Sequence, residues 1–460
     1  MAEPLRVLHV SQPNAGGVAV YVGQAAMDQR RRGWTVAVAC PPGGDLPERC
    51  MAAGVPWLNW DAARTPGPGV LAEALRLRRV VATFAPDVVH LHSSKAGLAG
   101  RLLRRPRGTP TLFQPHGWSW LAATGRQAAG SRRWERLAAR WSDALVCVGA
   151  GEQAQGMDAG VRGAYRLVRN GVDLARFTPA DGADRLAARI RLGLAAGVPL
   201  AVCVGRVTRQ KAQDVLVAAW PSVTERCPSA VLAIIGDGDD LARLRRERVP
   251  GVRFVPAVED TRDWLAASNV VALPSRWEGL PLTALEAHAM GRPIVGTDIP
   301  GITEIVAPGT GALVPVEDAG ALAAEIAARL ERPDAAEREG RAGAAASAAY
   351  DLSGTLELLA AVTREVAGGS SEEGRVDARA VAGGFVHAGL AGVGSAGGVV
   401  AGAVGAGAVG AGAVGAGAVG AGAVGTGAVG GGTVGAPGGG LNGPFGDAGG
   451  GAVTPPNSSR

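Results

Sequence analysis

The strongest constraint on the fold is an alternation of short apolar runs with longer helical patterns, which occurs twice along the chain. Short apolar runs are typical of strands that are buried on both faces of a parallel sheet. They lie at 6–10, 35–39, 87–91, 111–113 and 144–148 in the first half, and at 199–204, 230–235, 252–255, 270–273 and 293–296 in the second. Helix-length patterns such as residues 17–32 separate them. The sequence therefore predicts an α/β fold of two doubly wound, Rossmann-like domains whose strand ends face a ligand cleft.

The same pattern predicts the domain boundaries. We expect an N-terminal domain over residues 1–180, a second domain over 181–350 with a linker at 179–184, and a C-terminal helix over 351–366 that packs back on the first domain. The composition then changes, and residues 401–425 are five copies of AGAVG. Glycine carries a high entropy cost, and alanine and valine bury too little surface to offset it. Residues 367–460 are therefore predicted to be a disordered Gly/Ala/Val-rich tail.

The charge is unevenly distributed along the chain. The formal net charge is +5, yet residues 1–180 hold 23 lysines and arginines against 12 acidic residues. This excess could mark peripheral contact with an anionic membrane, or only solvated helix ends. No nucleic-acid-binding motif accompanies it, so a nucleic-acid partner is not expected.

The cysteines and the start of the chain indicate the compartment. Five cysteines form no C-x-x-C pair, which predicts no disulfide framework and no zinc site. The first residues, MAEPLRVLHV, lack the pattern of a secretory signal. We expect a cytoplasmic protein, which could be peripheral at the inner face of the membrane.

The first candidate site is the stretch RWEGLPLTALEAHAMG at 276–291, in which two glutamates stand eight residues apart. Pro281 suits the first position of a helix. The free amides of Leu282 and Thr283 would then form a phosphate site at the positive end of the helix dipole. Glu286 lies one turn further along, and Glu278 lies in the preceding loop. An ordinary N-terminal carboxylate and a solvated helix glutamate would give the same spacing.

The second candidate site is VGRVTRQKAQD at 204–214, which places two cations near the start of a predicted helix. Arg206 offers a bidentate guanidinium and Lys211 a compact ammonium, a combination that suits a diphosphate. The chain has only two lysines, Lys95 and Lys211. In a chain this rich in arginine, each could mark a position that needs an ammonium group.

Together these segments resemble the donor half of the retaining nucleotide-sugar glycosyltransferases of family 4, which have the GT-B fold. The resemblance rests on EGLPLTALEAHAMGRPIVGTDIPGITEIV and VGRVTRQK in the second half. Further segments agree: NAGGVAVYV (14–22), PDVVHLHSSKAG (86–97), QPHG (114–117) and RNGVDLARF (169–177). It covers about residues 5–365.

The resemblance implies a role for each candidate residue. Gly17 lets the backbone approach the distal phosphate of the donor, and Arg206 and Lys211 neutralise its diphosphate. Glu278 holds hydroxyl groups of the transferred sugar, and Glu286 holds the ribose. The remaining positions are the backbone of Gly279, Leu280, Leu282 and Thr283, His116 beneath the donor sugar, and Lys95 on the acceptor side.

We therefore expect a glycosyltransferase that moves a hexose from a nucleotide diphosphate sugar to a hydroxyl acceptor with retention of configuration. The nucleotide sugar is a co-substrate, and neither a cofactor nor a metal ion is expected. Related sequences with EGLP and HSSKAG build polysaccharides, so the acceptor could be lipid-linked. The alternatives are a glycoside hydrolase, whose paired carboxylates need no Arg206 or Lys211, and a non-catalytic sugar-nucleotide-binding protein. A nicotinamide oxidoreductase is disfavoured because no predicted strand precedes G-x-G-x-x-G.

Overall fold

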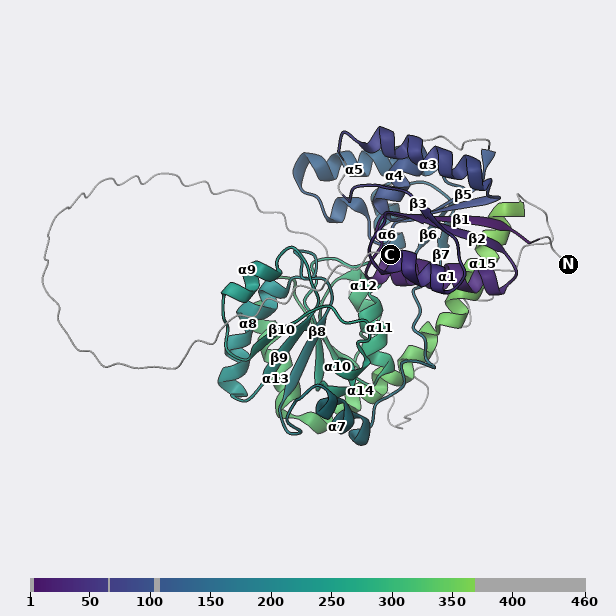
Figure 1. Cartoon of the computed structure of the whole chain (residues 1–460). Helices are drawn as coiled ribbons and strands as arrows, with labels where there is room; N and C mark the ends of the chain where they lie inside the picture. The colour runs from purple at the N-terminus through teal and green to yellow at the C-terminus, as the bar shows by residue number, and fades with distance from the viewer. Residues whose placement is uncertain (1–3, 65–66, 103–107, 369–460) are drawn as a thin grey trace, which may run out of the picture. The chain divides into compact units, whose positions relative to one another are not determined.

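Two parallel sheets, one after the other along the chain, form the framework of the protein (Figure 1). The computed structural model describes residues 4–64, 67–102 and 108–368, and the predicted tail lies outside them. Both sheets belong to one compact unit. The first has the order β3-β2-β1-β4-β5-β6-β7. Its strands are β1 (Arg6–Ser11), β2 (Thr35–Cys40), β3 (Trp57–Asn59), β4 (Val88–His92), β5 (Thr111–Gln114), β6 (Ala144–Cys147) and β7 (Tyr165–Leu167).

The second sheet repeats this topology with the order β10-β9-β8-β11-β12-β13. Its strands are β8 (Leu200–Val204), β9 (Val231–Ile235), β10 (Val252–Val255), β11 (Val270–Leu273), β12 (Ile294–Thr297) and β13 (Gly311–Val314). Neighbouring strands are parallel in both sheets. The strand order reverses between β1 and β4 in the first sheet and between β8 and β11 in the second. Ligands of doubly wound sheets bind at such reversals.

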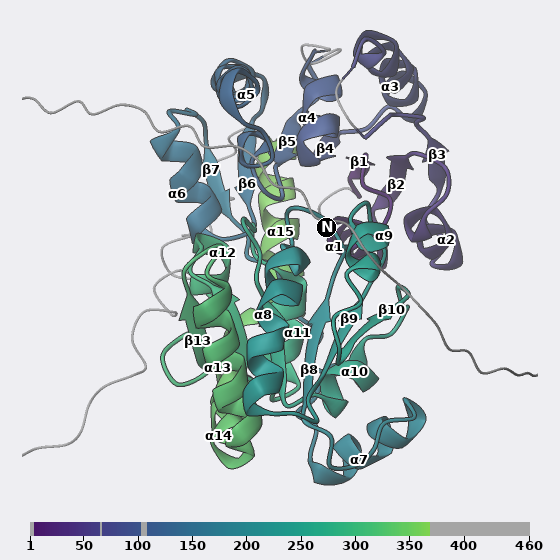
Figure 2. The same cartoon turned by 90° about the vertical axis from the view of Figure 1, so that its left-hand side faces the viewer.

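Helices connect successive strands and cover the faces of the sheets (Figure 2). Those of the first half are α1 (Gly17–Arg31), α2 (Asp45–Ala52), α3 (Val70–Phe84), α4 (Ser93–Leu102), α5 (Gly125–Ala138) and α6 (Ala150–Asp158). The second half contains α7 (Gly182–Arg191), α8 (Gln213–Arg226), α9 (Leu241–Arg246), α10 (Arg262–Ala267), α11 (Leu282–Ala289), α12 (Pro300–Thr303), α13 (Ala319–Glu331), α14 (Pro333–Ser347) and α15 (Leu352–Gly368). The expected pair of doubly wound α/β domains is confirmed.

Three strands have no counterpart in the sequence-based prediction, and all three lie at sheet edges. They are β3, β7 and β13. Most of their residues are only partly buried. An edge strand pairs on one side only, so its sequence need not form the continuous apolar run by which central strands are recognised. The ten predicted runs all coincide with strands.

The linker predicted at 179–184 is wrong in its second half. Helix α7 begins at Gly182, and Asp181 caps it. The Asp181 carboxylate accepts hydrogen bonds from the amides of Ala183 and Asp184, and the Asp184 side chain accepts from the amide of Asp181. This capping box satisfies amides that a helix start would otherwise leave unpaired. The predicted linker therefore overlaps the first turn of α7, and its part without helix ends at Asp181.

The last described helix, α15, returns to the first sheet after the second sheet is complete. It contacts α1, β4 and β5. Leu356, Leu359 and Val362 of α15 are buried in one cluster with Tyr21 of α1 and Leu112 of β5. The apolar face of α15 thus stabilises the first sheet with residues from the far end of the described chain.

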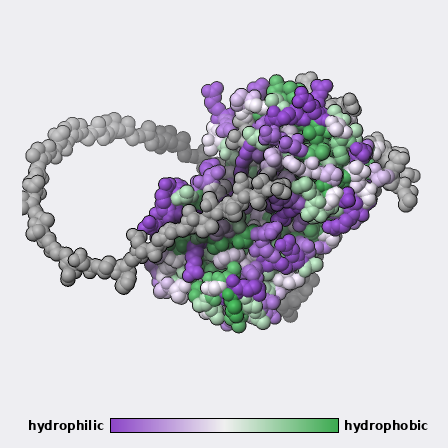
Figure 3. Space-filling model, in the orientation of Figure 1, coloured by the Kyte–Doolittle hydropathy of each residue, from purple (hydrophilic) through white to green (hydrophobic). Residues whose placement is uncertain are grey.

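Hydrophilic residues predominate on the face shown in Figure 3, with smaller hydrophobic areas between them. The exposed large hydrophobic side chains include Leu71 and Leu75 on α3 and Leu137 on α5. No helix among the described residues has the length and apolar character needed to span a membrane.

We expect the docking of α15 to contribute measurably to stability. Leu359 is 1% exposed, and a Leu→Ala change at such a position typically lowers the free energy of unfolding by about 2–5 kcal/mol. Leu71→Ala is the matched control because Leu71 is 67% exposed on α3. Chemical denaturation followed by circular dichroism measures both. Equal denaturation midpoints for the two variants would show that α15 is not docked as described.

Candidate active site

The loops that follow β8 and β11 bring the predicted cations and one predicted carboxylate together. These strands are adjacent and parallel, so their carboxyl ends lie at the same edge of the second sheet. Nζ of Lys211, in the loop after β8, lies 2.7 Å from Oε1 of Glu278, in the loop after β11. Residues that are 67 positions apart in sequence are thereby joined at the reversal of strand order.

Glu278 is held by more than its ion pair. The hydroxyl of Ser275 donates a hydrogen bond of 2.6 Å to Oε1, and Nε2 of Gln210 donates one of 3.4 Å to Oε2. Glu278 is 8% exposed. A buried carboxylate with one cation and two hydrogen-bond donors keeps a fixed orientation.

Arg206 lies at the same edge and faces the first half of the chain. A Cβ atom added to Gly16 would lie 4.0 Å from Cδ of Arg206, and one added to Gly17 would lie 3.8 Å from Cδ1 of Leu282. No side-chain hydrogen bond or ion pair to another described residue engages the guanidinium of Arg206. The glycines that precede and begin α1 thus meet both the cationic loop and the start of α11.

The start of α11 differs by one residue from the prediction. Pro281 precedes the helix with an extended ψ of 124°, and the helix itself begins at Leu282. Pro281 is therefore the N-cap and not the first helical residue. The amides of Leu282 and Thr283 still lie in the first turn, where the helix supplies no acceptor for them. Both residues are half-buried.

Gly279 and Leu280 are positioned by contacts with the first half of the chain. Nδ2 of Asn170 donates a hydrogen bond of 2.7 Å to the carbonyl oxygen of Leu280. A Cβ atom at Gly279 would lie 2.9 Å from Cγ2 of Val148 and 3.4 Å from the backbone nitrogen of Gly117. A side chain at position 279 would therefore separate the EGLP loop from the PHG loop.

The pKa of Glu286 is higher than its place in the sequence predicts. The position of both glutamates near a helix start and two cations predicts that their ionised forms are favoured. Burial instead raises the pKa of Glu286 to about 7, with smaller opposing effects from Arg176, which lowers it, and Asp260, which raises it. Among the described residues, neither Arg206 nor Lys211 forms an ion pair or hydrogen bond with this carboxyl group, and Lys211 pairs with Glu278 instead. The expectation is therefore wrong for Glu286.

His116 lies in the PHG loop after β5 with a positive φ of 52°. Its Nε2 is 3.0 Å from Nδ1 of His92, and its ring meets that of Tyr21 edge-on at 5.1 Å between centroids. Burial lowers the pKa of His116 to about 3, so the ring is neutral. Left-handed backbone at a residue other than glycine is strained and is often found at functional sites.

Lys95 forms a buried ion pair within the first half of the chain, and its assignment to the acceptor side of the substrate site stays a prediction. Lys95 belongs to α4, is 4% exposed, and its Nζ lies 2.7 Å from Oε2 of Glu73 on α3. Arg101, one of the many cations of residues 1–180, is likewise buried, with Nη2 2.7 Å from Oε2 of Glu135. Both cations join helices in the interior. The sequence could not show this because their partners lie in other helices.

Two further carboxylates position the loops and were missed by the sequence analysis. Glu152 accepts hydrogen bonds from the amides of Gly117 at 2.5 Å and Val148 at 2.8 Å. Glu304 accepts from the amide of Ala150 at 2.7 Å and pairs with Arg169 at 2.7 Å. Glu304 stands in the GITEIV segment, but its spacing alone gave no partner.

Comparisons with known proteins agree with this geometry. The family described as "Glycosyl transferase 4-like domain" matches residues 16–171, and "Glycosyl transferases group 1" matches residues 198–332. D-inositol 3-phosphate glycosyltransferase of Nocardia farcinica is 31% identical over 386 residues, which are 75% of this chain and 84% of the relative. A GDP-mannose-dependent phosphatidylinositol monomannoside mannosyltransferase of Corynebacterium glutamicum is 33% identical over 207 residues. That match covers 42% of this chain and 54% of the relative, about half its length.

Solved structures show the same fold. Sucrose-phosphate synthase from Thermosynechococcus elongatus has a TM-score of 0.69 at 24% identity, over 80% of this chain and all of that one. HepE of Anabaena, in complex with UDP and glucose, has a TM-score of 0.69 at 20% identity, over 78% of this chain and all of that one. With both halves matched and the two-sheet architecture shared, the chain belongs to the family-4 glycosyltransferases of GT-B fold.

Proposed function

We propose that this protein transfers a hexose from a nucleotide diphosphate sugar to a hydroxyl acceptor with retention of configuration. The observation that carries the proposal is the meeting of Arg206, Lys211 and Glu278 at one sheet edge, beside the open first turn of α11. Two cations and free amides suit a diphosphate, and a fixed carboxylate suits sugar hydroxyl groups. Relatives of this family that are named as mannosyl- and galactosyltransferases support the reaction class.

The reaction requires charge stabilisation more than proton transfer by the protein. The bond between the anomeric carbon and the diphosphate oxygen breaks, and a bond to the acceptor oxygen forms on the same face of the sugar. The departing diphosphate takes the proton of the acceptor hydroxyl. Negative charge therefore grows on the diphosphate in the transition state, where Arg206 and Lys211 would lower its free energy.

The ion pair between Lys211 and Glu278 fits two roles in this reaction. The ammonium group has three donors, so it can keep Glu278 while it binds a phosphate oxygen. The carboxylate has a second oxygen for a sugar hydroxyl. Glu278 would thereby orient Lys211 as well as the sugar.

A glycoside hydrolase remains the main alternative because the raised pKa of Glu286 would also suit a general acid. A hydrolase, however, does not need Arg206 and Lys211 beside a helix start that suits phosphate. The arrangement favours two separate contacts to one donor over an acid–base pair.

Removing either cation should slow the transfer reaction. Arg206→Ala and Lys211→Ala should each lower kcat by about 10²–10³-fold, the scale for losing one donor to a developing negative charge. Arg245→Ala, an exposed arginine on α9, is the control and should leave turnover unchanged. Turnover is measured as release of nucleoside diphosphate from a panel of nucleotide sugars. A loss below about threefold in both variants would refute the diphosphate assignment.

The pH dependence of turnover distinguishes glutamates that bind the donor from an acid–base pair. Because a carboxylate is the stronger acceptor for ribose hydroxyls, kcat/KM should rise as pH increases through about 7, the pKa of Glu286. Glu286→Gln should abolish this rise and increase the KM for the donor. Glu278→Gln should mainly lower kcat.

The same pH series can also contradict the assignment of Glu278 and Glu286 as donor contacts. Both variants should keep every limb of the kcat–pH curve, since neither glutamate transfers a proton in this account. If Glu286→Gln or Glu278→Gln removes one limb of that curve, a titrating acid or base has been lost. Glu225→Gln, an exposed glutamate on α8, controls for the loss of one negative charge.

We further propose that the acceptor is lipid-linked and that the first half of the chain contacts an anionic membrane. Helix α3 carries the exposed Arg76, Arg78 and Arg79 beside Leu71 and Leu75, which are 67% and 46% exposed. Exposed arginines and leucines on one helix are typical of binding to a membrane surface. The excess positive charge of residues 1–180 acts in the same direction.

Vesicle sedimentation tests the membrane contact. The protein should bind vesicles of acidic lipid at low salt, release them at high salt, and ignore neutral vesicles, because the attraction is electrostatic. Changing Arg76, Arg78 and Arg79 to Gln should weaken binding, whereas the same change at Arg243, Arg245 and Arg246 of α9 should not. Equal losses in both triple variants would exclude α3 as the contact.

A further inference from the structure

Four side chains form a continuous hydrogen-bonded chain that ends at His116. Oε1 of Gln29 on α1 lies 2.8 Å from Nε2 of His9 on β1. Nδ1 of His9 lies 2.9 Å from Nε2 of His92 on β4, and Nδ1 of His92 lies 3.0 Å from Nε2 of His116. Gln29, His9 and His92 are at most 1% exposed. The chain therefore runs through the interior from a helix to the PHG loop.

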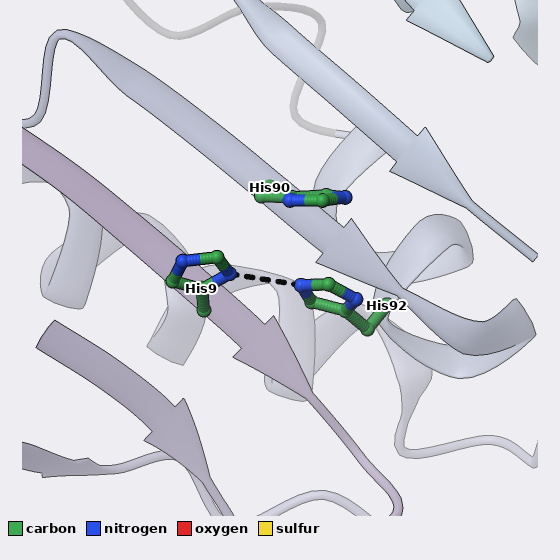
Figure 4. A group of neighbouring side chains, drawn as sticks. All are labelled: His9, His90 and His92. Atoms are coloured by element: carbon green, nitrogen blue, oxygen red, sulfur yellow. Dashed lines mark hydrogen bonds between the residues drawn. The ribbon is translucent and has the colours of Figure 1, made fainter. Parts of the chain in front are cut away.

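The sheet explains how these residues meet. His9 pairs in register with His90, and His92 is two residues further along β4 on the same face. Figure 4 shows the ring of His9 directed at a nitrogen of His92, while His90 lies over His92. Those two rings are 3.9 Å apart between centroids with a tilt of 34°. His9 and His92 thus use both of their ring nitrogens within the chain.

The cluster of His9, His90 and His92 could suggest a metal ion, since their nearest nitrogens lie within 4.8 Å of one another. A metal ion lies in the ring plane of each imidazole that binds it, and stacked rings cannot both point at one ion. Binding would also break the hydrogen bonds that His9 and His92 make. The geometry favours a hydrogen-bonded chain over a metal site.

The hydrogen bonds between these four side chains all run in one direction, because Gln29 contributes its side-chain oxygen, which can only accept. A neutral imidazole has one N–H donor and one acceptor nitrogen. Burial lowers the pKa of His9 to about 4 and that of His92 well below its usual value, so these rings are neutral. The Gln29 oxygen then requires a proton on Nε2 of His9, which leaves Nδ1 to accept from Nε2–H of His92. Nδ1 of His92 accepts in turn from Nε2–H of His116.

We propose that Gln29, His9 and His92 are positioning residues that hold His116 as its Nε2–H tautomer, with Nδ1 left as the acceptor for a hydroxyl of the transferred sugar. No group among the described residues hydrogen bonds to Nδ1 of His116. The proposal rests on the proposed function, because it takes His116 to lie beside the donor sugar. It adds that the tautomer of His116 is set by Gln29 of α1, through the rings of His9 and His92.

Nitrogen NMR of the protein labelled with ¹⁵N-histidine tests the tautomers directly. The chain has only six histidines, so His9, His92 and His116 can be assigned by single substitutions. We expect all three rings to be neutral and to carry the proton on Nε2. A proton on Nδ1 of His116, as would follow if the amide nitrogen of Gln29 faced His9, would overturn the proposal. Stoichiometric metal in the purified protein would overturn it as well.

Gln29→Met removes the acceptor while keeping the length of the side chain. It should produce a mixture of His116 tautomers and lower kcat about tenfold, with the KM for the donor little changed. Gln24→Met, on the same helix but outside the chain, should change neither. His9→Phe interrupts the chain one step nearer to His116 and should have the same effect as Gln29→Met. A single Nε2–H tautomer of His116 in either variant would refute the positioning role.

The two readouts separate this inference from the proposed function. In the protein without donor, the tautomer of His116 depends only on the hydrogen bonds that join it through His92 and His9 to Gln29. Nucleoside diphosphate release depends on the transferase activity. If all three rings carry the proton on Nε2 but no nucleotide sugar is turned over, the proposed function fails and the hydrogen-bonded chain of side chains is supported. If nucleotide sugar is turned over but His116 carries its proton on Nδ1, only the hydrogen-bonded chain is refuted.

Discussion

Parallel strand pairing is the constraint on which the rest of the structure depends. A parallel pair needs a long crossover connection, so every strand in a sheet ends at the same edge and every loop after a strand emerges there. In the second sheet this edge receives Arg206 and Lys211 from one loop and Glu278 from another. In the first sheet it receives Gly16 and Gly17 at the start of α1. The candidate site residues are therefore concentrated at these two reversals of strand order, where ligands of doubly wound sheets bind.

Hydrogen bonds between the two halves of the chain then fix the loops. Asn170 holds the carbonyl of Leu280, and Glu304 joins Arg169 to the start of α6. Glu152 holds the PHG loop beside Gly279. These contacts determine where His116 stands relative to the EGLP loop. A reaction that depends on preorganised charge needs such support, because small displacements of donors and cations weaken transition-state stabilisation.

The fold and much of the donor site could be predicted from the sequence, because central strands and helix starts have local patterns. Buried apolar runs marked ten strands, and the spacing of Arg206, Lys211 and Glu278 after them marked the sheet edge. Properties that depend on partners far away in the sequence could not be predicted. Lys95 is an internal ion pair with Glu73, and Glu286 has a raised pKa because of what surrounds α11. His90 lies in the predicted strand 87–91 and His92 lies one residue beyond its end, and this spacing could have indicated a polar cluster. Their contacts with His9, however, required the strand order.

A crystal structure of the protein with a bound nucleotide diphosphate sugar would show which residues bind the donor. We expect phosphate oxygens within hydrogen-bond distance of Arg206, Lys211 and the amides of Leu282 and Thr283. We expect the sugar to contact Glu278 and His116, and the ribose to contact Glu286. The contradicting result is phosphate bound instead in the charged cavity of about 300 Å³ that Arg209, Arg243 and Arg276 line together with Asp214, Asp240 and Glu317, with Lys211 engaged by Glu278 alone.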